Sequence, residues 1–177
     1  EDTIVVFETD LGKLLIEFFP EYAPNHVENF VTLSEDGYYT GTAFHRIIEG
    51  FMIQGGDPKT ADISYSLSEW GTGDPGYSID AEFSNIQHKR GIVSMARSAD
   101  PNSAGSQFFI VHNDSNFLDG QYTVFGRILT DESFATLDRI ASLGTLPNDQ
   151  PLDAWKTIIQ NVRVLDRSEL PNLLESS

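Results

Sequence analysis

The stretch FHRIIEGFMIQGGD, residues 44–57, places a histidine, an arginine and a glutamine among aromatic and branched apolar residues. Short apolar runs of this kind, interrupted by glycine, are typical of β-strands. Successive side chains of a strand point to opposite faces, so His45 faces one way while Phe44, Arg46 and Ile48 face the other. Arg46 is therefore expected on an otherwise apolar face.

Two interpretations of Arg46 are open on this evidence. In the first, it is a structural ion-pair partner for one of the many acidic residues, and the aromatic and methionine side chains around it are plain core. In the second, it belongs to a surface on which polar donors stand among apolar residues, a composition that recurs in SMAR at residues 94–97 and GSQFFI at residues 105–110. In the latter, alternation puts Gln107 and Phe109 on one face.

Further apolar runs, separated by Gly, Pro, Asn and Asp, predict a mainly β protein with eight strands. They cover residues 4–9, 14–18, 44–48, 51–54, 92–96, 107–111, 123–128 and 157–165, the first two forming a hairpin about a turn at 10–13. Helical spacing predicts two helices, at residues 24–36 beginning with Pro24 and at 132–143 with Asp131 as N-cap. Many short strands with a helix toward each end of the chain suggest a barrel.

Residues 57–91 differ from the rest, because glycine and proline replace apolar periodicity there. We expect a long ordered loop, and loops of that length commonly border a site. The length of 177 residues fits one domain, residues 1–166, followed by a tail at 167–177 that has no convincing period and is expected to fray.

Composition and charge disfavour several classes of partner. The 11 Lys and Arg against 27 Asp and Glu give a net charge of −16, which opposes binding to nucleic acid and anionic membranes. No apolar run approaches the ~20 residues that a membrane span needs, so a soluble protein is expected. The sequence begins at Glu1 without a signal peptide, which fits a processed or trimmed chain and leaves the cytoplasm and the periplasm both open.

The sequence lacks the residues that several common catalytic mechanisms require. The absence of cysteine excludes disulfides, thiolate nucleophiles and cysteine-based metal sites. The four histidines are too widely spaced for a metal-binding helix, and no metal or cofactor is expected. Ser106 lacks the second glycine of a nucleophile elbow, and the glycine-rich residues 71–76 lack the lysine of a phosphate-binding loop.

The motifs taken together closely resemble the signature of the cyclophilins, the cyclosporin-sensitive family of peptidyl-prolyl cis-trans isomerases. The resemblance covers residues 3–165 and rests on residues 44–57, GSQFFI, FLDG at 117–120 and VFG at 124–126, which follow the family's order at nearly its spacing. It implies a closed eight-stranded antiparallel β-barrel capped by two α-helices, with a groove on the outer face. It also implies a rotamase that accelerates rotation about X-Pro bonds in proline-containing peptides and folding proteins, without a cofactor.

Carried over position by position, the resemblance implies that Arg46 is the catalytic donor and that Gln54 binds the substrate backbone. It also implies that the proline ring is held by Phe51, Met52, Phe109 and Leu118. Besides Arg46, Phe51, Gln54 and Phe109, ten residues are expected to contact substrate: His45, Met52, Gly71, Thr72, Ala96, Arg97, Gln107, Phe117, Leu118 and Tyr122. Among them, Gln107 is expected to support the Arg46 side of the groove, and residues 71–73 to form its far wall.

The chain departs from the family's animal members at three places. Phe117 and Tyr122 replace a Trp and a His, a pattern of bacterial or archaeal character that predicts weak cyclosporin binding. Arg97 replaces a frequent Asn and alters the charge of the groove, and residues 98–102 form a longer segment that is expected to tune substrate preference. A function of another class stays open, namely a non-catalytic proline-peptide binding module or chaperone.

Overall fold

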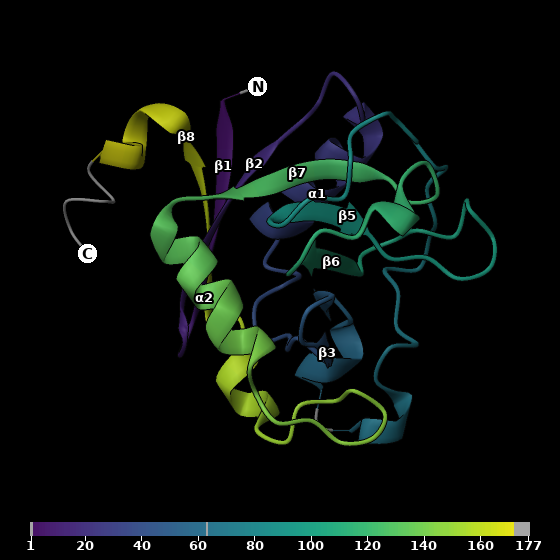
Figure 1. Ribbon diagram of the computed structural model, residues 1–177, viewed down its shortest axis with the longest axis vertical. Helices are drawn as coiled ribbons and strands as arrows, with labels where there is room; N and C mark the ends of the chain where they lie inside the picture. The colour runs from purple at the N-terminus through teal and green to yellow at the C-terminus, as the bar shows by residue number, and fades with distance from the viewer. Residues whose placement is uncertain (1, 63, 172–177) are drawn as a thin grey trace.

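The computed structural model describes residues 2–62 and 64–171, and its main feature is one antiparallel sheet of eight strands that curls around a core (Figure 1). The strands are β1 (Thr3–Thr9), β2 (Gly12–Phe18), β3 (Arg46–Ile48), β4 (Met52–Gly55), β5 (Ile92–Met95), β6 (Phe108–Val111), β7 (Val124–Leu129) and β8 (Asn161–Asp166). Their order across the sheet is β3-β4-β6-β5-β7-β2-β1-β8. The predicted mainly β class and eight strands are confirmed.

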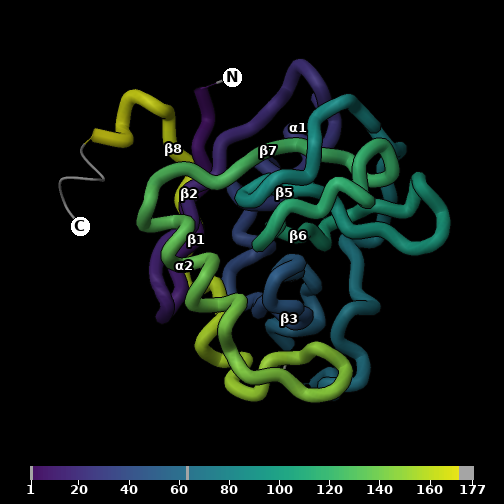
Figure 2. The backbone as a smooth tube through the Cα atoms, in the orientation of Figure 1, coloured from purple at the N-terminus to yellow at the C-terminus, as the bar shows by residue number. Residues whose placement is uncertain are grey.

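The first strand of the chain, β1, and the last strand, β8, pair with each other and lie side by side (Figure 2). Their ladder runs from the pair Thr3 and Asp166 to the pair Glu8 and Asn161. The β1–β2 ladder continues as far as Gly12, so the turn of this hairpin is shorter than the predicted residues 10–13.

The two predicted helices are present. Helix α1 (Pro24–Glu35) begins at Pro24 as expected. Helix α2 (Asp131–Ala141) starts earlier and ends earlier than predicted, and its N-cap is Thr130 rather than Asp131, because the Thr130 hydroxyl accepts the amide of Ser133 at 3.2 Å. Apolar residues of both helices pack into the interior core of the sheet. Neither helix has the length and apolar character of a bilayer-spanning segment, and the same is true of every other helix within the described residues.

Strand pairing does not close the sheet into a barrel, contrary to the prediction. In the part of the chain that the structure describes, the edge strands β3 and β8 have no shared ladder. Irregular backbone fills the seam instead: Gly41 donates to Ile159 at 2.7 Å, Ile159 donates to Thr42 at 2.9 Å, and Ile47 of β3 donates to Asp149 at 2.8 Å. A loop carbonyl thus satisfies the edge amide of Ile47, and the segments at residues 41–42 and 159 pair with each other, in place of direct β3–β8 pairing.

An aromatic cluster fills the interior, with Phe30 of α1 at its centre. Five rings lie with their centroids 5.0 to 5.9 Å from the ring of Phe30: Phe7, Phe18, Tyr39, Phe108 and Phe125. Phe44 lies in this core together with Ile47, so it does not share a face with Arg46 as alternation had predicted. The reason is that β3 begins only at Arg46, and the residues before it do not follow strand geometry.

The long loop expected at residues 57–91 is largely irregular, with two short 3-10 helices at Pro58–Ala61 and Leu67–Glu69. At the C-terminal end, Leu170 packs against a small apolar cluster of Ile4, Val6 and Leu15. Residues 172–177, most of the tail that was expected to fray, lie outside the described residues.

The cluster around Phe30 generates a stability prediction. Phe30→Ala should lower the free energy of unfolding by about 3 to 5 kcal/mol, because it removes a fully buried ring and leaves a cavity among five others. Urea unfolding followed by circular dichroism measures the change. Phe117→Ala is the matched control, since that ring is 68% exposed and its loss should cost far less. Equal losses in the two variants would contradict the assignment of the core.

Candidate active site

Three neighbouring strands bring Arg46, Gln54 and Phe109 into one row. Arg46 on β3 pairs with Gln54 on β4, and Gln54 pairs with Phe109 on β6. Directly paired residues of an antiparallel ladder point to the same face. The row lies on the outer face of the curled sheet, since Phe108, the residue directly before Phe109, points into the interior core.

A cavity of about 130 Å³, here called the cup, adjoins this row, and apolar side chains form part of its lining. Arg46 lies exposed at its edge. The ion pairs within residues 2–62 and 64–171 are made by other cations, so the interpretation of Arg46 as a structural ion-pair partner is wrong. The cup is lined by Arg46, Phe51, Met52, Gln54, Ala96, Arg97, Phe109, Leu118 and Tyr122.

The ring of Phe109 is held by two neighbouring rings, of which the sequence analysis singled out Tyr122 but not His88. His88 stacks on it with a centroid distance of 6.0 Å and an interplanar angle of 14°, and Tyr122 contacts it edge-on at 5.7 Å. The two ring nitrogens of His88 lie 3.0 Å from the Asp119 carboxylate and 3.0 Å from the Ser94 hydroxyl. The wall of the cup is thus held by stacking and by a buried polar chain.

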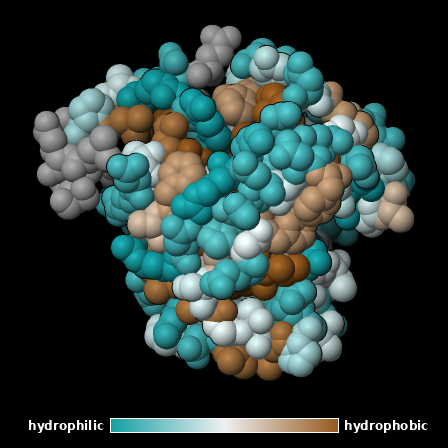
Figure 3. Space-filling view, viewed as in Figure 1, coloured by the Kyte–Doolittle hydropathy of each residue, from teal (hydrophilic) through white to brown (hydrophobic). Residues whose placement is uncertain are grey.

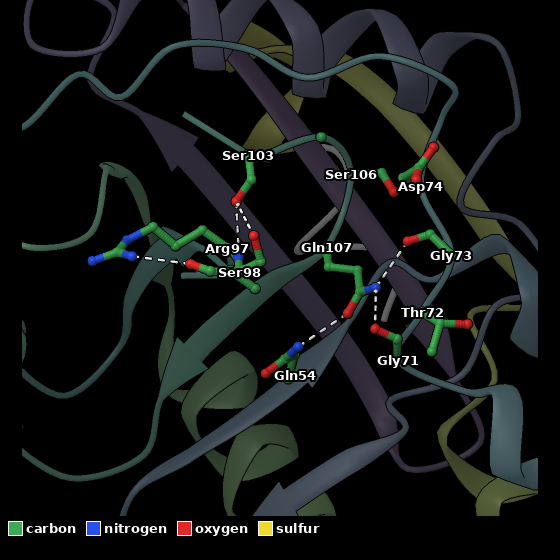
Figure 4. Close-up of a pocket in the computed structure, with 12 residues that line it drawn as sticks. Gln54, Gly71, Thr72, Gly73, Asp74, Arg97, Ser98, Ser103, Ser106 and Gln107 are labelled. Atoms are coloured by element: carbon green, nitrogen blue, oxygen red, sulfur yellow. Dashed lines mark hydrogen bonds between the residues drawn. The ribbon is translucent and has the colours of Figure 1, made fainter. Parts of the chain in front are cut away.

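A second cavity of about 340 Å³, here called the polar cavity because polar residues and glycines make up most of its lining, shares Gln54, Ala96 and Arg97 with the cup (Figure 4). Gln107 connects its walls, because the side-chain amide donates to the carbonyls of Gly71 at 3.0 Å and Gly73 at 2.9 Å. The Gln107 oxygen accepts the amide of Gln54 at 3.0 Å. Gln107 therefore supports the far wall and Gln54, the cross-strand neighbour of Arg46.

Asp57 anchors that far wall, a role that sequence reasoning missed. Its carboxylate is buried and accepts the backbone amides of Lys59 at 2.8 Å, Gly71 at 2.5 Å and Gly73 at 3.2 Å. A Cβ atom at residue 73 would collide with this carboxylate, so only glycine fits there. Asp57, the last residue of the motif at 44–57, thus holds a loop that lies 14 to 16 residues further along the chain.

Arg97 brings a second cation to the boundary between the two cavities. Its guanidinium donates to the carbonyls of Gln121 at 2.9 Å and Ser98 at 3.0 Å, and it lies 4.7 Å from the ring centroid of Tyr122. Both Arg46 and Arg97 line the cup, and no acidic residue does. The cup is therefore locally positive on a chain of net charge −16, whereas Asp74 lines the adjoining polar cavity.

The structure brings most of the predicted site residues to these two cavities. Gly71, Thr72 and Gln107 line the polar cavity, and the others line the cup, with two exceptions. Phe117 is largely exposed and contacts Phe51 with a centroid distance of 5.4 Å, and His45 is buried behind the far wall next to Gly71. In the described part of the chain, no three acidic or histidine side chains gather as metal ligands.

A family model described as cyclophilin type peptidyl-prolyl cis-trans isomerase matches residues 4–164. The chain belongs to the cyclophilins. It is a peptidyl-prolyl cis-trans isomerase, as the names of its cyclophilin relatives and the matched family model show. The family predicted from the motifs is thereby confirmed.

Relatives and solved structures agree with this assignment. A peptidyl-prolyl cis-trans isomerase of Synechococcus elongatus is 44% identical over 80% of this chain and 94% of its own, in keeping with a bacterial character, and one of Schizosaccharomyces pombe is 40% identical over 87% and 95%. A Cryptosporidium parvum cyclophilin, solved in the presence of the dipeptide Ala-Pro, shares 34% identity with a TM-score of 0.80 and covers 92% of this chain and 99% of its own. A cyclophilin from Hirschia baltica shares 29% identity with a TM-score of 0.71 and covers 92% and 73%.

His45 is kept neutral in this cyclophilin. The side chain is only 4% exposed, and neither ring nitrogen has a hydrogen-bond partner within the described residues. Burial lowers the pKa of His45 from 6.5 to about 4, the charge of Asp57 opposes that shift, and the charge of Arg46 adds to it. Burial also lowers the pKa of His26 and His88. These imidazoles consequently resist protonation in the folded state.

A pH dependence of stability follows from His45. Above pH 6.5 the residue is neutral in both states, whereas between pH 6.5 and about 4 only the unfolded chain binds the proton, so stability falls as the pH falls through this window. His45 alone accounts for up to about 3 kcal/mol. Urea unfolding across this range should show a shallower decline for His45→Gln than for the unaltered protein. Identical declines would contradict the assigned burial.

Proposed function

We propose that the cup holds the substrate proline while Arg46 stabilises the twisted X-Pro amide during rotation. The observation that carries this proposal is the position of the Arg46 guanidinium, which is uncommitted to any ion pair in the described residues and lies at the edge of a cavity lined in part by apolar side chains. An arginine has five donors and stays charged at every physiological pH. It is thus available to a substrate rather than to the fold.

Rotation about an X-Pro bond needs few groups beyond a hydrogen-bond donor and a cavity that holds the proline ring. Amide resonance raises a barrier of ~18 to 20 kcal/mol, and that resonance is lost when the bond twists. The prolyl nitrogen then regains a lone pair, to which a guanidinium can donate a hydrogen bond that the planar ground state cannot accept equally well. Because no covalent bond changes, the step needs neither a nucleophile nor a titrating base.

The apolar wall supplies binding and exclusion of water. Met52, Phe109 and Leu118 are buried residues that offer an apolar surface to a pyrrolidine ring. With less water nearby, a hydrogen bond from Arg46 is stronger than it would be in solvent. The stacked His88 limits movement of the Phe109 ring, which keeps the wall in shape for either isomer.

Polar groups next to the cup are suited to hold the peptide on either side of proline. Gln54 pairs with Arg46 across the sheet, and its amide is oriented by Gln107. The Ala96 amide already donates to the Gln107 carbonyl at 3.0 Å, so at residues 96–97 the Ala96 carbonyl and the Arg97 amide are the groups proposed to bind substrate. The proposed substrates are proline-containing peptides and unfolded or folding proteins.

The competing candidate is a module that binds proline peptides without turnover. Membership of an isomerase family and the free guanidinium of Arg46 both favour the enzyme. Exchange NMR on a short Ala-Pro peptide separates the two, because an isomerase broadens or exchanges the cis and trans signals at catalytic amounts. Tight peptide binding with unchanged exchange would establish the binding module instead.

Arg46 provides the sharpest mutational test. Arg46→Ala should lower kcat/KM by ~10²-fold or more, the usual loss for one preorganised donor, while the fold remains intact. Arg46→Lys should restore only part of the activity, because a point charge lacks the planar fork of donors. Arg127→Ala is the matched control, since that residue pairs with Glu17 on β2, away from the cup. If Arg46→Ala were inactive only because it unfolds, as judged by circular dichroism, the proposed role would be wrong.

Cyclosporin binding is proposed to be weak because Phe117 stands where animal relatives have a Trp. Phenylalanine offers no N–H to an inhibitor carbonyl, and one lost hydrogen bond is worth ~0.5 to 1.5 kcal/mol, or about 2- to 13-fold in affinity. Phe117→Trp should therefore tighten cyclosporin by several-fold and leave peptide turnover nearly unchanged, since Phe117 does not line the cup. Titration of both proteins with the drug measures this, and equal inhibition constants would refute it.

A further inference from the structure

His112 holds the turn between β3 and β4, although it takes no part in the mechanism above. The Gly50 amide donates to Nδ1 of His112 at 2.8 Å, and the His112 amide donates to the carbonyl of Phe51 at 2.8 Å. The turn itself has a bond from the Phe51 amide to the Ile48 carbonyl, and Gly50 has a φ of +82°. Residue 112 thus contacts the two residues of the turn that precede β4.

The proton positions on His112 follow from these bonds. Because Nδ1 accepts from the Gly50 amide, it carries no proton, and the imidazole proton must lie on Nε2. Nε2 is 3.0 Å from an oxygen of Asp138 on α2, to which it donates. The tautomer that can hold Gly50 is therefore the one that Asp138 selects.

Arg90 fixes Asp138 in turn. Its guanidinium donates to both carboxylate oxygens, at 2.7 and 3.0 Å, and to the carbonyl of His112 at 3.1 Å. The same guanidinium lies 5.1 Å from the ring centroid of Phe134 on α2. The Arg90 bonds hold the pKa of Asp138 below its usual value, so its carboxylate is ionised and ready to accept. An oriented chain thus runs from Arg90 through Asp138 and His112 to Gly50.

The turn matters because it carries Phe51 into the cup. Phe51 lines the cup and contacts the ring of Phe117, and its own backbone is bonded to residue 112. We propose that His112 is a positioning residue for the isomerase reaction, which holds the Gly50 amide through a ring oriented by Asp138 and so sets the position of Phe51. The proposal rests on the proposed function of the cup.

A pair of substitutions separates this role from general stabilisation. His112→Asn keeps a side-chain acceptor at nearly the position of Nδ1, whereas His112→Ala removes it. His112→Ala should lower kcat/KM by about 2- to 13-fold, the equivalent of one hydrogen bond, with most of the change in KM, and His112→Asn should restore most of the loss. Arg163→Ala, which breaks an ion pair with Glu8 between β1 and β8, is the control and should leave both constants unchanged.

Amide hydrogen exchange by NMR gives a readout that does not depend on activity. The Gly50 amide should exchange faster in His112→Ala than in His112→Asn, while the Gly41 amide, bonded to the Ile159 carbonyl, serves as an internal reference. Unchanged kcat/KM in His112→Ala despite faster Gly50 exchange would overturn the proposal, and so would an equal loss of activity in both variants. If His112→Ala does not fold, Asp138→Ala should show the same loss in weaker form, and full activity there would refute it. An unaltered protein that exchanges Gly50 slowly yet lacks isomerase activity would instead refute the proposed function.

Discussion

The antiparallel register between β4 and β6 is the constraint on which the rest of this cyclophilin depends. It places two adjacent phenylalanines on opposite faces: Phe108 in the interior aromatic cluster and Phe109 in the wall of the cup. A slip of one residue would exchange the two faces and empty both sites at once. The core that stabilises the fold and the cavity proposed to bind proline are therefore specified by the same set of backbone hydrogen bonds.

Around this register, the polar anchors have separate tasks. Asp57 and Gln107 hold the far wall through backbone groups, and His88 supports the cup from behind. Each anchor is buried or partly buried and fully engaged, as expected for polar groups removed from water. Arg46 is the contrast, because it is a strong donor left without an ion-pair partner in the described chain. Such a difference between committed and free polar groups distinguishes supporting residues from those available to a ligand.

Charge adds a second contrast. The chain as a whole carries a net charge of −16, and the face shown in Figure 3 is mostly hydrophilic with hydrophobic residues in separate patches. Arg46 and Arg97 nevertheless line the cup without an acidic neighbour among its lining residues. Carbonyl oxygens of a peptide carry partial negative charge, so a locally positive cup suits a peptide backbone better than the surrounding acidic surface does.

The sequence by itself predicted the eight strands and the two helices, because apolar periodicity and Pro24 are local signals, whereas it predicted the residues of the cup only through the resemblance of its motifs to those of the family. Only the tertiary structure decided how the seam between β3 and β8 is filled, that Asp57 anchors residues 71–73, that His45 lies behind the groove, and that His112 meets Asp138 on α2. These features join groups that lie far apart along the chain. The partner of each of these groups depends on how the packed elements approach one another in space. The periodicity within a single element does not determine that approach.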